Sequence, residues 1–125
     1  MGNILGNKIP IVSFNYIEEH IKDENCILIN TLDKENQEYL IKNTINHIEE
    51  PSIINKLNKR NTVIVYGKNC RDYSPYYKYN QLKKLGYENV YVYNGGLFEW
   101  CILQEIFGDD NFETTSKCKD ILLYK

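Results

Sequence analysis

The second half of the chain alternates strand and helix twice, and this pattern limits the fold more than any other feature. Strands are expected at Thr62–Tyr66 and Asn89–Tyr93, because both are runs of β-branched and aromatic residues between turn-forming ones. Amphipathic helices are expected over residues 75–85 and 97–107, each followed by a glycine. Strands joined through helices pair in parallel, with helices on both faces of the sheet.

The first half of the chain begins with a similar unit. Ser13 suits the N-cap of a helix over residues 14–21, and Ser74 suits the N-cap of the later helix that begins at Pro75. Cys26–Ile29 is a continuous apolar run, typical of a strand covered on both faces. The polar segment after this strand has one short β-like stretch at 44–48 before a helix opened by Pro51. We therefore predict a three-layer α/β domain with a central, mostly parallel sheet of about four to five strands.

The length of 125 residues suits one domain with one hydrophobic core. We expect residues 1–125 to form that domain, with the core at about 9–108 and a tail at 109–125, whose Ile121-Leu122-Leu123 docks as a short last element. The net charge of −2, with both signs spread along the chain, argues against nucleic acid or anionic lipid as a partner. No apolar run approaches the ~20 residues of a membrane span.

The N-terminal residues predict an intracellular protein. They lack the basic start and the apolar stretch of a secretory signal, which favours a reducing, cytoplasmic location. Gly2 fits the start of a myristoylation signal, but Gly6 stands where Ser or Thr is required. Asn, Ile, Lys and Tyr make up nearly half of the chain, a bias typical of A/T-rich genomes such as those of large DNA viruses or some protists. A viral chain would act in the host cytoplasm or in the virion.

The cysteines and histidines show no metal-ligand spacing. The chain has no C-x-x-C pair, and His20 and His47 lie on separate segments. We therefore expect no metal, no cofactor and no disulfide framework. Cys26 and Cys101 fall in apolar periodic segments, where a thiol acts as a small buried hydrophobe.

The block from Thr62 to Trp100 is similar to rhodanese-like domains. It contains a strand, a loop, a helix, "Leu-Gly-Tyr", a second strand and then Gly95-Gly96-Leu97-Phe98-Glu99-Trp100. A Gly-Gly-x-x-x-Trp signature follows the last strand in that family, and the similarity extends over about residues 9–108. The resemblance implies a catalytic cysteine in the loop between the central strand and the next helix.

A loop of this kind can hold an anion, because backbone amides and the helix dipole converge there. Cys70 is the only cysteine in the loop, and we predict it as the nucleophile that accepts a sulfane sulfur as a persulfide. The plain alternative is a surface cysteine without a role. Substrate binding is predicted for the neighbouring loop and helix-start residues Lys68, Asn69, Arg71 and Ser74.

The loop also departs from the family pattern. Counted from the strand, Gly67 stands where the family has its cysteine, and Cys70 comes three residues later. Counted back from Leu82, the expected place falls on about Asn69, so the loop is about two residues longer than in short-loop sulfurtransferases. Asn30-Thr31-Leu32 stands where many members carry Asp-x-Arg, so the usual internal ion pair is missing.

Two functions follow from the resemblance and stay open at this point. One is a thiosulfate or persulfide sulfurtransferase that takes sulfur from a small anionic donor through Cys70. The other is a pseudoenzyme, a silent module that binds a protein partner or a ligand through the same loop and the aromatic surface of Tyr73, Tyr76 and Tyr77.

Overall fold

Five strands form one parallel sheet in the computed structural model, which describes residues 8–118 and 120–125. The strand order is β1-β5-β4-β2-β3, so β4 holds the central position. All neighbouring strands run parallel, as predicted. Gly2 and Gly6, which bear on myristoylation, lie outside the described residues. The strands are β1 (Ile11–Val12), β2 (Cys26–Asn30), β3 (Thr44–Ile45), β4 (Thr62–Tyr66) and β5 (Asn89–Tyr93).

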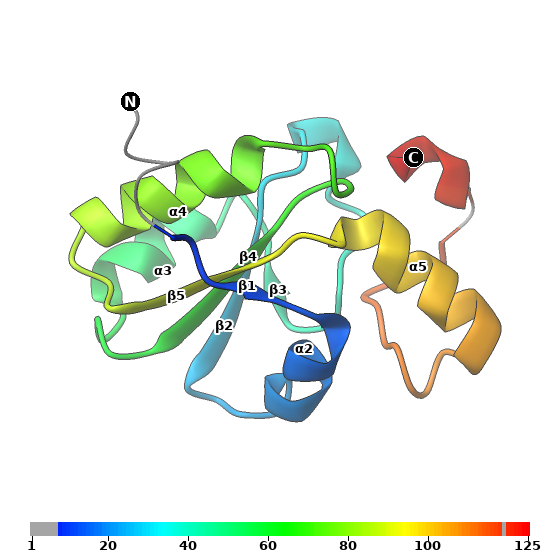
Figure 1. Ribbon diagram of the computed structural model, residues 1–125, viewed down its shortest axis with the longest axis horizontal. Coiled ribbons are helices and arrows are strands. Elements are labelled where there is room, and N and C mark those ends of the chain that lie inside the picture. Colours follow the sequence, from blue (N-terminus) through cyan, green and yellow to red (C-terminus); the bar gives the residue numbers. More distant parts are fainter. Residues whose placement is uncertain (1–7, 119) are drawn as a thin grey trace.

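The helices cover both faces of the sheet, which gives three layers (Figure 1). α2 and α5 lie over one face, where the core includes Ile17 and Trp100. α3 and α4 lie over the other face, with Ile54 and Leu82 in a second core cluster. The three-layer α/β prediction is therefore confirmed. The helices are α2 (Phe14–His20), α3 (Glu50–Lys56), α4 (Ser74–Lys84) and α5 (Gly96–Phe107), with the short 3-10 turns η1 (Lys34–Asn36) and η2 (Ile121–Tyr124).

Strand β4 connects the two cores. Its side chains alternate between the faces of the sheet, with Val63 and Val65 in the cluster under α3 and α4 and Ile64 and Tyr66 in the other. All four are completely buried. The Tyr66 hydroxyl is satisfied inside the core, because it lies 2.8 Å from Thr44 Oγ1. A strand held on both faces gives the loop that follows it a rigid starting point.

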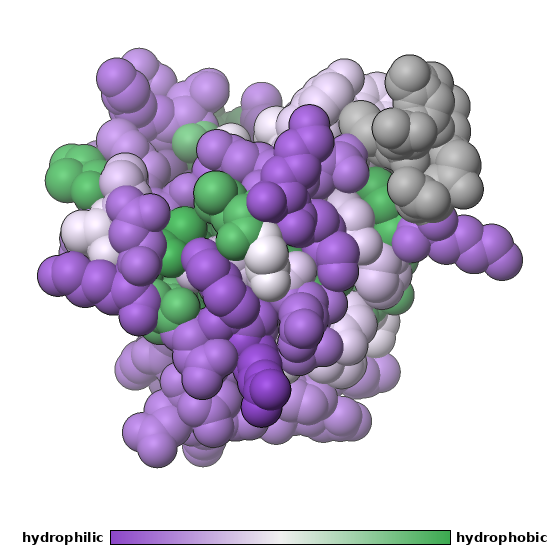
Figure 2. Space-filling model, turned by 90° about the vertical axis from the view of Figure 1, so that its left-hand side faces the viewer, coloured by the Kyte–Doolittle hydropathy of each residue, from purple (hydrophilic) through white to green (hydrophobic). Residues whose placement is uncertain are grey.

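The carboxyl ends of β2, β4 and β5 meet at one edge of the sheet, and the segments that follow these strands lie together there (Figure 1). Candidate sites in parallel sheets lie at this edge. The opposite side of the molecule, viewed in Figure 2, is mostly hydrophilic and has only small, separate hydrophobic patches. Within residues 8–118 and 120–125, no helix is long and apolar enough to cross a membrane.

The helix starts differ from the sequence prediction. Ser13 takes the N-cap position of α2 with an extended backbone, but its side chain makes no capping hydrogen bond. Helix α4 begins at Ser74 rather than Pro75, and Tyr73 occupies the N-cap position. The capping acceptor is the Asp72 carboxylate, which receives the Ser74 amide at 2.9 Å. Pro75 still fits the first turn, where its missing amide costs no hydrogen bond.

Smaller corrections concern the first half and the cysteines. The β-like stretch predicted at 44–48 is reduced to the two residues of β3, and α3 begins one residue before Pro51. Cys101 is buried in the core as expected, whereas Cys26 is only half-buried.

Glycines end α4 and α5 with positive φ angles, +101° at Gly86 and +102° at Gly108.

The C-terminal tail packs against α5. Phe112 is 4% exposed and meets the Trp100 ring edge-on, with 5.1 Å between ring centroids. Trp100 Nε1 donates to the Glu113 carbonyl at 3.0 Å, so the polar edge of the indole is satisfied by the tail. The tail ends in η2, but its docking residue is Tyr124, at 6% exposure. Of the three residues expected to dock, Ile121 is partly buried against the same core, whereas Leu122 and Leu123 are exposed.

Candidate functional site

The connection between β4 and α4, residues 67–73, lies beside a cavity of about 450 Å³ at the carboxyl edge of the sheet. Lys68 and Arg71 bring positive charge to its wall, and Asp33 and Asp72 bring negative charge. The four residues predicted to bind substrate all line this cavity: Lys68, Asn69, Arg71 and Ser74.

The Asp72 carboxylate occupies the place where the loop meets the start of α4. Asp72 Oδ2 accepts the backbone amide of Lys68 at 2.9 Å, and Oδ1 accepts the amide of Ser74 at 2.9 Å. The Ser74 hydroxyl also donates to Oδ1, at 2.7 Å. Amides from both ends of the loop therefore converge on an anion, but that anion is a side chain of the same loop.

A threonine from the neighbouring strand end completes this arrangement. Thr31 follows β2 directly, and its Oγ1 lies 2.7 Å from Ser74 Oγ. Because Ser74 donates to Asp72, it can accept from Thr31 at the same time. The Thr31 amide donates to the Tyr66 carbonyl at 2.9 Å, which fixes the threonine against the end of β4.

Gly67 has no room for a side chain in this arrangement. A Cβ at this position would collide with Asp72 Oδ2 and would lie 2.9 Å from both Pro75 Cγ and Thr31 Oγ1. Gly67 is buried, and it stands where the family resemblance puts the reactive cysteine. The Asp72 carboxylate therefore fills the volume that a side chain of residue 67 would need.

The Gly-Gly signature holds the other side of the same loop. Gly96 has a φ of +71°, and a Cβ there would lie 2.8 Å from the Asn69 amide nitrogen and 2.9 Å from the Gly67 carbonyl oxygen. This close approach lets the first amides of α5 reach the loop. Leu97 donates to the Gly67 carbonyl and Phe98 to the Lys68 carbonyl, each at 3.0 Å. The glycines of the signature thus allow α5 to hold the loop backbone, and its tryptophan covers the core.

Cys70, the predicted nucleophile, is exposed and does not line the cavity. The Asn69 side chain next to it accepts the Arg71 amide at 2.9 Å. Burial raises the pKa of Tyr76, and the nearby Tyr73 and Cys70 raise it further. The structure thus brings the four predicted binding residues around one cavity, and Cys70 is not among the residues that line it. The catalytic role of Cys70 remains a prediction.

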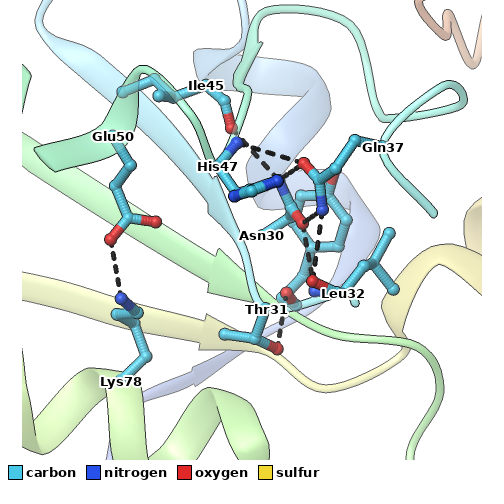
Figure 3. A network of polar contacts seen from close by, with 9 residues as sticks. Asn30, Thr31, Leu32, Gln37, Ile45, His47, Glu50 and Lys78 are labelled. Atoms are coloured by element: carbon cyan, nitrogen blue, oxygen red, sulfur yellow. Dashed lines mark hydrogen bonds and ion pairs between the residues drawn. The ribbon is translucent and has the colours of Figure 1, made fainter. Parts of the chain in front are cut away.

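A neutral amide network stands at the position of the missing ion pair (Figure 3). Asn30 is 3% exposed and exchanges two hydrogen bonds with Gln37, at 3.0 and 2.8 Å. Asn30 also donates to the Ile45 carbonyl at 3.1 Å and accepts the Leu32 amide at 3.0 Å. Buried polar atoms are thereby satisfied without charge, which avoids the cost of desolvating an ion.

A separate ion pair lies on the α3 and α4 side of this network. Lys78 Nζ and Glu50 Oε2 are 2.7 Å apart, with both side chains largely shielded from solvent. Figure 3 shows the pair next to Thr31 and the Asn30 network, near the second opening at this edge of the sheet. The pair joins α3 to α4, and neither of its residues lines the cavity beside Lys68.

Sequence reasoning missed Asp72 and Thr31. Asp72 stands two residues before Ser74-Pro75, a spacing typical of a capping side chain, so its signal was present. Thr31 has no local signal, because its partner Ser74 is 43 residues away. Across the described residues, no group of three or more His, Cys, Asp or Glu side chains has the arrangement of a metal site.

Fold and loop together define an α/β domain whose parallel sheet presents a strand-to-helix loop, closed by a Gly-Gly turn, at its carboxyl edge. The family model of the rhodanese-like domain matches residues 12–103. The chain therefore belongs to the rhodanese-like domain family.

Solved structures of bacterial proteins have similar folds. The Alr3790 protein from Anabaena sp. has a TM-score of 0.63 and 18% identity, covering 90% of this chain and 83% of that one. The BH2092 protein from Bacillus halodurans has a TM-score of 0.64 and 20% identity, covering 79% and 74%. SseA from Escherichia coli, described with the 3-mercaptopyruvate sulfotransferases, has a TM-score of 0.61 and 18% identity, covering 74% and 47%. No curated protein matches the sequence.

Proposed function

We propose that this domain is a catalytically silent rhodanese-like module that binds a partner protein through the rim of the β4–α4 loop. The observation that carries the proposal is the position of the Asp72 carboxylate, which accepts the amides of Lys68 and Ser74. A sulfur donor such as thiosulfate is an anion and would need those donors. It would also meet the negative charge of Asp72.

The place of attack supports the same proposal. Gly67 carries no nucleophile at the position that the family resemblance assigns to the cysteine, and the volume beside it is filled. Cys70 comes three residues later in the chain, is exposed and does not line the cavity beside the converging amides. A thiol outside such a cradle lacks the partial positive charge that stabilises a thiolate.

The rim of the loop offers groups suited to a protein partner. Tyr73 and Tyr77 are 70% and 65% exposed, one helical turn apart at the start of α4. Arg71 is exposed beside them, and Lys68 is exposed across the cavity. Exposed tyrosines next to arginine are typical of the energetically important part of protein interfaces. We infer a partner segment with acidic side chains next to apolar ones.

Sulfurtransferase activity through Cys70 is the competing function. One observation favours it: the thiol is exposed and therefore accessible to a persulfide donor. In that reaction the Cys70 thiolate would form a bond to the sulfane sulfur of the donor, while the bond from that sulfur to the rest of the donor breaks and releases sulfite from thiosulfate or a thiolate from a persulfide. An acceptor thiolate would then attack the outer sulfur of the Cys70 persulfide and release the Cys70 thiolate.

The mass of the protein after incubation with thiosulfate, or with a persulfide donor, separates these functions. We expect an unchanged mass for the silent module. A gain of one sulfur atom that disappears in Cys70→Ser would overturn the proposal. A gain that persists in Cys70→Ser and maps to another cysteine would overturn it as well, because a second thiol would then be active.

The binding role needs a matched set of variants. We expect partners captured from extracts of the source cells to be lost when Arg71→Ala and Tyr73→Ala are combined. Lys83→Ala with Lys84→Ala is the control, since both lysines are exposed at the far end of α4. Equal loss with both pairs would indicate nonspecific capture and contradict the rim as the binding surface.

A further inference from the structure

Two cysteines that are 17 residues apart in the sequence belong to the core region where the tail packs against α5. Cys101 lies on α5 and is 1% exposed, within the core cluster under that helix. Cys118 is half-buried and packs against the same cluster. Cys118 therefore packs onto the same group of buried side chains that contains Cys101. Tyr39 and Tyr124, whose rings stack at a centroid distance of 6.2 Å, belong to this group and line a cavity together with Cys118.

Only one of these thiols meets an open space. Cys118 lines a cavity of about 480 Å³ together with Tyr39, Leu123 and Tyr124, whereas Cys101 does not line it. A small solute that enters this cavity would reach Cys118 first. Cys101 would be the next sulfur behind it. A thiol at a cavity wall with a second, buried thiol in the core behind it is the arrangement of a reactive and a resolving cysteine.

We propose that Cys101 and Cys118 form a reversible disulfide when the domain meets a hydroperoxide. In the first step the Cys118 thiolate attacks one peroxide oxygen, which breaks the O–O bond and leaves a sulfenic acid. The second oxygen takes up the proton of the thiol and leaves as water from hydrogen peroxide, or as an alcohol from an organic hydroperoxide. In the second step Cys101 attacks the sulfenic sulfur, the S–S bond forms, and the hydroxyl group leaves as water with the Cys101 proton. Two thiols are oxidised and one hydroperoxide is reduced.

The order of the two cysteines follows from their surroundings. Burial raises the pKa of Cys101 to about 12, with Cys118 adding to the effect, so Cys101 is a poor first nucleophile at neutral pH. The sulfenic acid at Cys118 would form next to Cys101, which favours resolution by that thiol over further oxidation.

The disulfide would fix the tail beside the β4–α4 loop. The end of the tail already contacts this loop, since the Asn69 side chain donates to the Tyr124 carbonyl at 2.9 Å. The start of α5 holds the same loop through Leu97 and Phe98. A disulfide between residues 101 and 118 would also lower the conformational entropy of the unfolded chain, because it closes the segment between them into a loop. We expect the oxidised domain to have a Tm higher by on the order of 10 °C.

The test uses the full chain with Cys70→Ser, because exposed Cys70 would otherwise form disulfides between molecules. The protein is treated with dilute hydrogen peroxide, remaining thiols are alkylated, and peptides are mapped without reduction. We expect a peptide linking Cys101 to Cys118, a loss of two hydrogen atoms in the intact mass, and a higher Tm that a reductant reverses. Adding Cys26→Ser should leave all three results unchanged, because Cys26 lies on β2.

Adding Cys118→Ser should abolish the link and the Tm shift and leave Cys101 as a thiol. This variant avoids a substitution in the buried core, and thermal unfolding before oxidation checks that it is folded. The proposal is overturned if Cys118 is oxidised to a sulfinic acid without joining Cys101. It is also overturned if Cys101 pairs with Cys26, or if both thiols remain reduced while Cys118 is alkylated readily.

Discussion

The two neighbouring strand-to-helix connections, β4–α4 and β5–α5, hold the same stretch of backbone in opposite ways. The longer one, residues 67–73, satisfies the amides of Lys68 and Ser74 with its own Asp72 side chain. The shorter one, Asn94-Gly95, brings α5 so close that its first amides donate to carbonyls of the longer loop. The β4–α4 connection thus supplies a side-chain acceptor for its own amides. The β5–α5 connection brings backbone amides of α5 to the carbonyls of the β4–α4 loop.

This difference separates the contacts that hold the loop in place from the groups that face its amides. The Gly96 contact preserves the position of the loop, which is a property of the backbone. The chemistry of the cradle depends on what faces its amides, and here a single carboxylate does. Substitutions in the shorter connection should therefore affect stability most, and those in the longer one progressively less.

The largest expected effect is that of Gly96→Ala. The substitution places a side chain at a φ of +71° and against backbone atoms of Asn69 and Gly67, which cannot move as a flexible side chain would. We expect a loss on the order of 3 kcal/mol in the free energy of unfolding, measured by urea denaturation. Gly86→Ala is the control, because its φ is +101° with nothing within 4 Å of the added carbon. It should cost about 1 kcal/mol. Equal losses would mean that the close approach to the loop contributes nothing.

Gly67→Ala should have the second-largest effect. The added methyl group would meet Asp72 Oδ2, Thr31 Oγ1 and Pro75 Cγ, but two of these atoms are side-chain tips that can shift. We expect a loss of about 2 kcal/mol in the same measurement.

A double-mutant cycle identifies the cause of that loss. With Asp72→Gly, part of the space opens, so the cost of Gly67→Ala should fall by about 1 kcal/mol. Strict additivity of the two substitutions would show that Asp72 does not fill the volume beside residue 67.

Asp72→Ala comes third. It leaves the amides of Lys68 and Ser74 and the Ser74 hydroxyl without their acceptor, as in the loss of a helix cap, at a cost of about 1 kcal/mol. Asp72→Asn keeps one acceptor oxygen and should lose less. Thermal unfolding of the two variants checks the order, and a larger loss for Asn than for Ala would contradict the capping role.

Most of the fold could be predicted from the sequence, because it depends on local patterns. The runs at Thr62–Tyr66 and Asn89–Tyr93 are strands with the predicted bounds, and α4 and α5 match within one residue at their starts. The position of the tail could not be predicted. Phe112 is one aromatic residue in a polar segment, and only the folded surface of α5 shows where it is buried.

The site was predictable in part, for the same physical reason. Adjacent loop residues such as Lys68 and Arg71 come together around the cavity simply because they share a loop. The contacts that decide what the loop can do span long distances along the chain, as between Thr31 and Ser74 or between Gly96 and Asn69. Local periodicity carries no information on such contacts, which is why the occupied cradle appeared only in the structure.

The smallest expected effect is that of Cys70→Ser, at the tip of the longer connection. The thiol is exposed, so its replacement by a hydroxyl buries nothing and should change the free energy of unfolding by less than about 0.5 kcal/mol. Cys101→Ser is the matched comparison, because it places a hydroxyl in the core and should cost at least about 1 kcal/mol. A loss for Cys70→Ser as large as that for Cys101→Ser would mean that the thiol is held by the loop after all. The silent module would then need to be reconsidered, because a thiol fixed among the loop amides is what a sulfurtransferase requires.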